Sequence, residues 1–135
     1  MANVDKIREF DPIKIDLGGK ERIIQFDMNA FALLENKFGS IQGALETFEA
    51  GRMSDIKLIL WTGLVHEEVK GYDEDTGEPT GYNITPYQVG SWIKNPGMLK
   101  DVSAKLGEAM AAGMSDSDLE AAEEFIKQQQ AAKNP

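Results

Sequence analysis

Apolar residues recur with helical spacing most regularly in the stretch SDIKLILWTGLVHEE, which runs from Ser54 to Glu68. Two apolar rows follow this stretch, and a helix that is apolar on two sides needs neighbours on both. We expect Ser54 to cap its start, and the pair Lys70-Gly71 lies just beyond its end. One row consists of Ile56, Ile59, Leu60, Gly63 and Leu64, and the other of Leu58, Trp61 and Val65. The pattern predicts that this helix is the centre of the hydrophobic core.

Nearer the N-terminus the pattern changes to the alternation of apolar and polar residues that is typical of β-strands. Ile13–Leu17 alternate in this way, Gly18 and Gly19 follow, and a second run spans Arg22–Phe26. Glycine supplies the positive φ that tight hairpin turns require, so the pattern predicts a β-hairpin. Because an isolated hairpin is marginally stable in water, this one must pack on the helices or pair with another chain.

Two shorter helices are predicted between the hairpin and the central helix. Asp27 or Asn29 is expected to cap the first helix and Ser40 the second, while Gly39 and Gly51 stand where helices end. The connectors are only a few residues long, so the three helices are expected to pack closely together.

Beyond the central helix, residues 69–83 lose all periodicity and gather Gly, Pro, Asp and Thr, which predicts an exposed loop. Thr85 is expected to cap the next helix, and Asn95-Pro96-Gly97 to stop it. The three helices predicted after the loop run from Pro86 to Ile93, from Met98 to about Ala112, and from Ser115 or Ser117 to about Gln130. The last one is weakly apolar and continues into a polar tail.

Together these elements predict one α+β, mainly α, domain over residues 1–135, with the N-terminal β-hairpin packed against a compact bundle of five to six short helices. Residues 13–68 would form the hairpin and a three-helix core, and residues 84–135 the C-terminal helices with the polar tail. A chain of this length can bury about two-thirds of its unfolded surface, so it can fold without disulfides or metal.

Composition narrows the functional classes. The net charge is −9, which is the wrong sign for a protein that coats nucleic acid. The chain has no cysteine, which fits a reducing compartment. No apolar run approaches the ~18 residues that cross a bilayer, and the first residues lack the apolar core of a signal peptide. We therefore expect a soluble intracellular protein.

Few residues of the chain are candidates for catalysis or for cofactor binding. His66 is the only histidine, and a zinc-protease helix would need a second histidine four residues away, where Thr62 and Lys70 stand. No glycine-rich phosphate motif occurs, and a nucleophilic serine would lack a suitable base. The sequence therefore predicts no enzyme, no catalytic residue and no cofactor.

The acidic residues of the predicted loop resemble a calcium loop only superficially. An EF-hand counted from Asp73 needs glycine at its sixth position and glutamate at its twelfth, where this chain has Glu78 and Ile84. We therefore expect no metal site, and we interpret Asp73, Asp75 and Glu78 as a solvated acidic loop.

Apolar residues after the loop are the remaining candidates for function. They either cover the central helix or form a contact surface for another protein, a role that suits methionine because it is flexible and repacks easily. The candidate contact residues are Trp92, Met98, Leu99, Met110, Met114, Leu119, Phe125 and Ile126.

The hairpin around Gly18-Gly19, followed by FDMNAFALLENKFGS (Phe26–Ser40) and MSDIKLILWTGLVHE (Met53–Glu67), resembles the tail assembly chaperones of long-tailed bacteriophages and related prophages. The resemblance covers roughly Ile13–Glu68. It implies a non-enzymatic protein of the bacterial host cytoplasm that binds the tape measure protein, keeps it soluble and is displaced as tail tube subunits add, so that it is missing from the mature virion. It also implies self-association, for which a free edge of the hairpin would be suitable.

Two other classes fit the same residues. The chain could be a different small structural or completion protein of the tail, which would remain in the particle. It could also be a general protein-interaction domain with no connection to phages.

Overall fold

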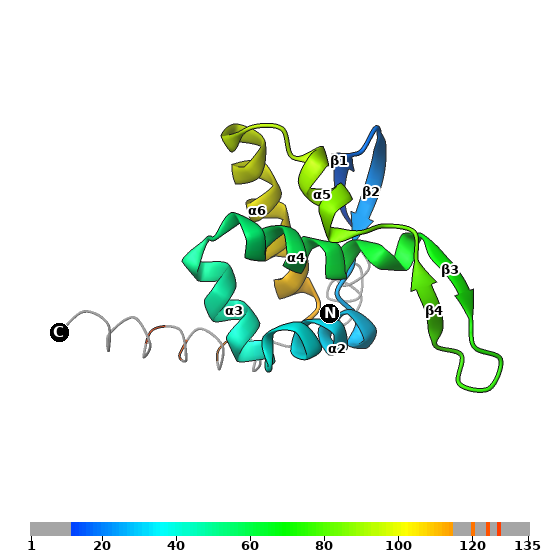
Figure 1. Cartoon of the computed structure of the whole chain (residues 1–135). Coiled ribbons are helices and arrows are strands. Elements are labelled where there is room, and N and C mark those ends of the chain that lie inside the picture. Colours follow the sequence, from blue (N-terminus) through cyan, green and yellow to red (C-terminus); the bar gives the residue numbers. More distant parts are fainter. Residues whose placement is uncertain (1–11, 115–119, 121–123, 125–126, 128–135) are drawn as a thin grey trace, which may run out of the picture.

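Helix α4 (Met53–Leu64) runs through the middle of the fold in a computed structural model that describes residues 12–114, 120, 124 and 127 (Figure 1). Its neighbours are α2, α3, α5 and β2. The described elements are β1 (Ile13–Leu17), β2 (Lys20–Ile24), α2 (Met28–Phe38), α3 (Ile41–Ala50), α4, the 3₁₀ turn η1 (Val65–Glu67), β3 (Val69–Tyr72), β4 (Pro79–Tyr82), α5 (Pro86–Trp92) and α6 (Pro96–Ala112). The fold is α+β and mainly α, as the sequence predicts.

Both predicted apolar rows of α4 face the interior. Every member is buried except Leu58, which is half-buried against the core. The boundaries differ from the prediction, because the helix begins at Met53 with Arg52 at the cap position and without a side-chain cap from Ser54. Arg52 instead forms an ion pair with Asp55 in the first turn, with 3.6 Å between Nε and Oδ2. At the other end, the α-helix stops at Leu64 and tightens into η1.

The predicted N-terminal hairpin is present and is joined by the two glycines. Gly18 and Gly19 have φ of 64° and 84°, so Leu17 pairs directly with Lys20 and β2 begins two residues earlier than predicted. The hairpin lies between the helices, with β2 against α4 and β1 against α6. Its inward side chains, Ile15, Leu17 and Ile24, join the same hydrophobic cluster as α4.

Gly18 is also required for close packing, because a Cβ atom there would lie 2.5 Å from Cε2 of Trp92. We expect Gly18→Ala to destabilise the protein by about 1–3 kcal/mol through overpacking added to backbone strain. Gly19→Ala is the matched control, since Gly19 has open space around it and incurs only about 1 kcal/mol of left-handed backbone strain. Urea unfolding of both variants measures the difference, and equal losses would show that the contact with Trp92 does not matter.

Helices α2 and α3 begin and end where the sequence predicts. The Asp27 carboxylate accepts the N–H of Ala30 at 3.0 Å, and the Ser40 hydroxyl accepts the N–H of Gly43 at 2.9 Å. Gly39 and Gly51 adopt the left-handed conformation at the two C-termini. These local signals are sufficient because a cap depends on residues only three or four positions apart.

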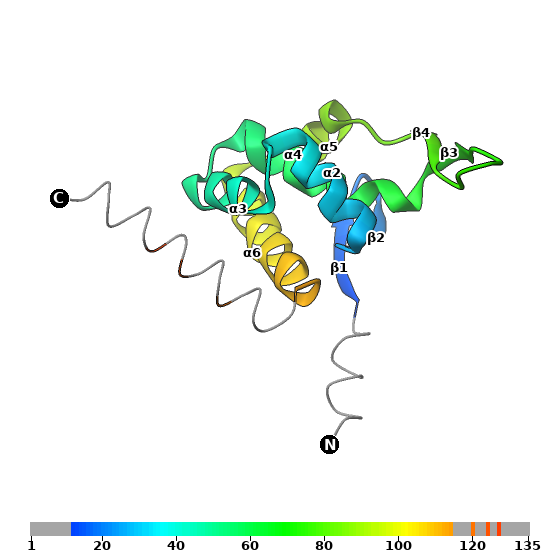
Figure 2. The ribbon, with the colours of Figure 1, turned by 90° about the horizontal axis from the view of Figure 1, so that it is seen from below.

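Residues 69–83 are exposed, but the prediction of an irregular loop is wrong. Strands β3 and β4 pair antiparallel and form a second hairpin, which we call the β3–β4 arm (Figures 1 and 2). Each strand has four residues, and the register shifts on either side of Gly71. Such short and irregular strands cannot show two clear periods of alternation, so the hairpin left no signal in the pattern.

The last two described helices again follow capping signals. Thr85 and Gln88 form a capping box at the start of α5. Asn95 does not simply stop that helix, because its side chain caps α6, which begins at Pro96, two residues before the predicted start. The predicted helix from Ser115 or Ser117 to Gln130 lies outside the described residues, apart from Glu120, Glu124 and Lys127, which are helical. No described helix is long and apolar enough to cross a membrane.

Candidate functional site

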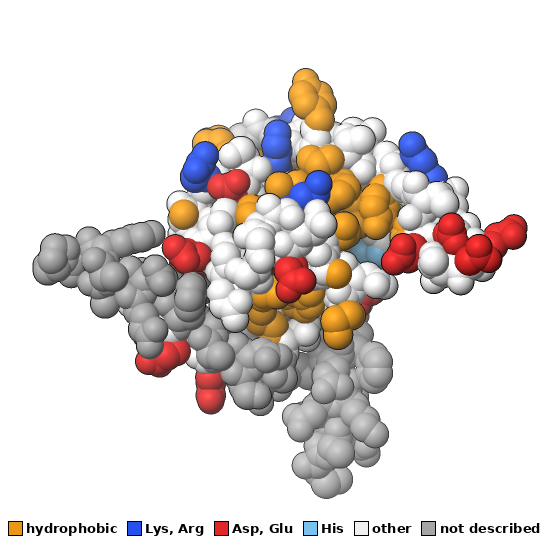
Figure 3. Space-filling model, turned by 60° about the horizontal axis from the view of Figure 1, so that its bottom comes forward, with side chains coloured by type: hydrophobic (Ala, Val, Ile, Leu, Met, Phe, Trp, Pro, Cys, Tyr) orange, Lys and Arg blue, Asp and Glu red, His pale blue; other side chains and the backbone are white. Residues whose placement is uncertain are grey.

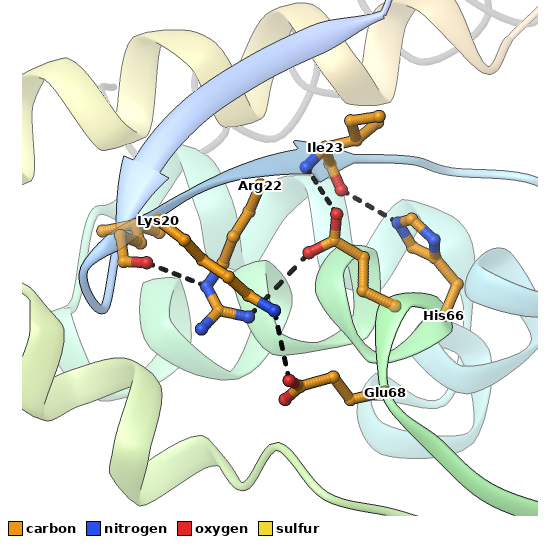
Figure 4. Close-up of polar contacts among 7 residues, drawn as sticks. Lys20, Arg22, Ile23, His66 and Glu68 are labelled. Carbon is orange, nitrogen blue, oxygen red and sulfur yellow. Dashed lines mark hydrogen bonds and ion pairs between the residues drawn. The ribbon is translucent and has the colours of Figure 1, made fainter.

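His66 and Glu67 hold the outer edge of the N-terminal hairpin (Figure 4). The backbone groups of Ile23 face away from β1. The N–H of Ile23 donates to Glu67 Oε2 at 3.0 Å, and its carbonyl accepts from His66 Nε2 at 2.9 Å. The N–H of Gln25 donates to the carbonyl of Gly63 at 2.9 Å. Two side chains of η1 and one backbone carbonyl near the end of α4 therefore bind the edge of the hairpin where a third strand would otherwise pair.

Arg22 extends this cluster into the interior. Its Nε donates to the carbonyl of Leu17 at 2.9 Å, and its guanidinium carbon lies 4.1 Å from the centre of the Trp92 ring. Arg22 Nη1 and Glu67 Oε1 are 3.9 Å apart, too far for a hydrogen bond, so the two buried atoms interact as an ion pair alone. This cluster joins β2, η1 and α5, and its geometry is that of a structural clamp.

The clamp leaves little of the hairpin free for strand pairing. The β2 edge is occupied at Ile23 and Gln25 by groups of the same chain, so it is not free to pair with another subunit at those residues. The β1 edge lies against α6, where Lys105 Nζ donates to the carbonyl of Lys14 at 3.1 Å. Among the described residues, no three His, Asp or Glu side chains gather as they would around a metal ion.

The candidate contact residues differ in burial. Met110 is 2% exposed and belongs to the core, so its assignment to a contact surface is wrong. It lies on the buried face of α6 with Val102 and Leu106, and this is the face that covers the central cluster. Leu119, Phe125 and Ile126 lie outside the described residues.

The remaining four candidates are half-buried. Trp92, Met98 and Leu99 pack against the core. The Trp92 ring lies against Gly18 and Arg22, so this residue fastens α5 to the hairpin. All four line surface hollows: Trp92 and Met98 one beside the Gly18-Gly19 turn, Leu99 a second and Met114 a third.

Four large apolar side chains stand out on the surface of the described residues, and sequence reasoning missed all of them. They are Met28 (83% exposed), Tyr87 (79%), Met53 (71%) and Tyr72 (65%). Met28 and Met53 are the first residues of α2 and α4, and Tyr87 is in the first turn of α5. These three are apolar residues in the first turn of a helix and off its buried face, and this combination is a signal that the sequence contains.

The first surface hollow, which we call the α2–α3 groove, has a volume of about 420 Å³. Apolar side chains from both helices line it, together with Gly113 and Met114, which follow the end of α6. Its lining includes two carboxylates and no lysine or arginine. The lining residues are Asp27, Met28, Phe31, Glu35, Ser40, Ile41, Gln42, Leu45, Gly113 and Met114.

The second hollow, which we call the α4–α5 groove, has a volume of about 560 Å³. The charged residues that line it are positive, whereas those of the α2–α3 groove are negative. It is lined by two lysines and by no acidic residue. The exposed side chains of Met53 and Tyr87 belong to this groove. The lining residues are Met53, Ser54, Lys57, Tyr87, Gly90, Ser91, Ile93, Lys94, Asn95, Pro96 and Leu99.

Figure 3 shows exposed apolar side chains on one face of the body and a group of Asp and Glu side chains at the end of the projecting arm. All four exposed apolar residues lie on the two grooves or on the arm. Such surfaces are suited to contacts with other proteins. No family model, curated protein or solved structure matches the chain.

Proposed function

We propose that this protein is a tail assembly chaperone of a long-tailed bacteriophage or prophage. It would bind the tape measure protein in the host cytoplasm, keep it soluble, help to recruit tail tube subunits, and leave before the virion is complete. The proposal is supported by the resemblance over Ile13–Glu68 and by the apolar grooves of a chain whose only histidine is engaged in a structural clamp.

The exposure of Met28 beside the α2–α3 groove is the observation that carries the proposal. A methionine that is 83% exposed gains nothing from its position in the isolated domain. In a complex it would fold over an apolar helix lying in this groove, which Met114 also lines. Asp27 and Glu35 would favour lysine or arginine at the margins of that helix.

A long apolar helix aggregates before assembly unless its apolar face is covered. A groove that accepts one segment of such a helix needs only modest affinity, since several copies along one tape measure protein bind with avidity. Modest affinity per copy also permits displacement by tube subunits. The α2–α3 groove would suit this role because its surface is mainly apolar and includes the flexible side chains of Met28 and Met114.

Co-expression with the tape measure protein encoded beside this chain tests the proposal. We expect the tape measure protein to become soluble and to co-purify. Met28→Ser should weaken binding by about tenfold or more, because a buried methionine contributes about 1.5–3 kcal/mol. Met53→Ser is the matched control, since Met53 is also an exposed first residue of a helix but lines the other groove.

Two results would contradict the proposal. A tape measure protein that is equally soluble without this chain would remove the chaperone role. Finding the chain in purified virions at stoichiometric amounts would instead identify a structural component of the tail. If the tape measure protein is solubilised but Met28→Ser binds as tightly as the wild type, the function stands and the binding groove lies elsewhere.

A further inference from the structure

The β3–β4 arm projects from the body of the protein (Figures 1 and 2). Its base is fixed, because the N–H of Asn83 donates to the carbonyl of Glu68 at 2.8 Å and the Tyr82 ring meets the Trp61 ring edge-on at 5.8 Å. Beyond the base, the two strands pack chiefly on each other. A two-stranded hairpin without further packing is marginally stable, so this arm would gain stability by docking on a surface.

The tip of the arm is ordered and negatively charged. The Asp73 carboxylate accepts the N–H groups of Asp75 and Thr76 at 2.9 and 3.0 Å, and the N–H of Asp73 donates to the carbonyl of Glu78 at 2.8 Å. The N–H groups of Thr76 and Asp75 hold the pKa of Asp73 below its usual value, so it stays ionised at neutral pH. Three further acidic side chains share this turn, and Tyr72 is exposed beside it.

The α4–α5 groove has the complementary properties. Lys57 and Lys94 are its only charged lining residues, and its exposed apolar side chains, Met53 and Tyr87, would contact an incoming aromatic ring. Among the described residues, neither lysine forms an ion pair, although Lys57 lies partly against Gly90. A partner that brings carboxylates and one aromatic side chain would therefore fit both the charge and the apolar surface of this groove.

The arm and the start of the groove lie at opposite ends of α4. The groove begins at Met53, the first residue of α4, whereas the arm leaves from η1 at the opposite end of α4 (Figure 1). We propose that the β3–β4 arm of one copy docks in the α4–α5 groove of a second copy, with the acidic turn facing Lys57 and Lys94 and Tyr72 facing Met53 and Tyr87.

Such a contact joins two different surfaces of the chain. When two copies are joined in this way, one still has a free arm and the other a free groove, so further copies can add to form a ring or an open chain. This self-association does not depend on the proposed function. If the protein is a chaperone, the assembly would present several α2–α3 grooves to one tape measure protein.

Sedimentation velocity of the full chain over a range of concentrations tests the contact. We expect the wild type to self-associate, less so at high salt because the charges are exposed. Two double variants reverse the charges, Glu74→Lys with Asp75→Lys on the arm and Lys57→Glu with Lys94→Glu in the groove. Each should weaken self-association about tenfold or more. Glu49→Lys with Glu108→Lys, and Lys100→Glu, are controls at exposed positions outside the arm and the groove.

Mixing the two double variants is the decisive experiment. The reversed arm then fits the reversed groove, so the mixture should recover the assembly that each variant alone has lost. Melting temperatures establish that both variants are folded. A wild type that stays monomeric to about 1 mM, variants that assemble as the wild type does, or a mixture of folded variants that fails to recover assembly would overturn the proposal. If the groove captures another acidic protein while the wild type stays monomeric, it serves a different partner and the proposal is wrong.

Discussion

Trp61→Ala is expected to destabilise the protein by about 3–5 kcal/mol, the usual cost of removing a large aromatic side chain from a core. Trp61 is buried in α4, its Nε1 donates to the carbonyl of Ile84 at 2.8 Å, and its ring supports Tyr82 at the base of the arm. The variant therefore loses core packing and also the attachment of residues 82–84. Denaturant unfolding followed by far-UV circular dichroism measures the loss.

Trp61→Phe separates these contributions. Phenylalanine keeps an aromatic ring in the core but cannot donate to the carbonyl of Ile84, so we expect a smaller loss than for alanine. Increased amide hydrogen exchange at Tyr82 and Asn83 in the alanine variant would report the loosened arm. An unchanged melting temperature for Trp61→Ala would show that this side chain is not part of the core.

Glu67→Ala is the second change with a large expected effect, about 3–5 kcal/mol, because it breaks a buried ion pair and leaves one charge without its partner. The change removes the carboxylate 3.9 Å from Arg22 Nη1 and the acceptor of the Ile23 N–H. Arg22 is almost fully buried beneath Trp92 and cannot easily regain water. The free energy of unfolding in urea, measured near neutral pH, gives the loss.

Glu68→Ala is the matched control. Glu68 is the next residue and also forms an ion pair, with Lys20 at 3.2 Å, but this pair lies at the surface. Exposed pairs contribute about 0–1 kcal/mol, so the two neighbouring glutamates should differ severalfold. A Glu67→Gln variant should lie between them, because an amide oxygen can still accept the Ile23 N–H. Equal effects of Glu67→Ala and Glu68→Ala would show that the clamp does not stabilise the hairpin.

The central helix illustrates what a pattern can predict. The spacing from Ile56 to Val65 predicts burial on two sides, and the burial follows because a helix repeats every 3.6 residues whatever surrounds it. The boundaries of the helix follow less directly from the spacing. Ser54 is a reasonable cap by residue type, yet α4 begins one residue before it, and Arg52 and Asp55 form an ion pair across the first turn.

The candidate contact surface illustrates what a pattern cannot predict. Met98, Met110 and Met114 have the same residue type and lie on or next to one helix, yet Met110 is in the core and Met114 lines a groove. Periodicity gives the face of a helix but not the partner that covers it. The exposed Met28 and Met53 lie before residues 69–83, whereas the predicted contact residues all lie after them.

The sequence by itself determined the elements whose signals are local: the Gly18-Gly19 turn, the caps at Asp27, Ser40 and Thr85, and the two-sided central helix. Only the tertiary structure decided that His66 and Glu67 hold the edge of a strand more than 40 residues away. It also decided that residues 69–83 form an arm and that four exposed apolar residues lie at grooves and on that arm. Capping and periodicity act within a few residues, whereas clamps and grooves depend on chain segments that meet only after folding.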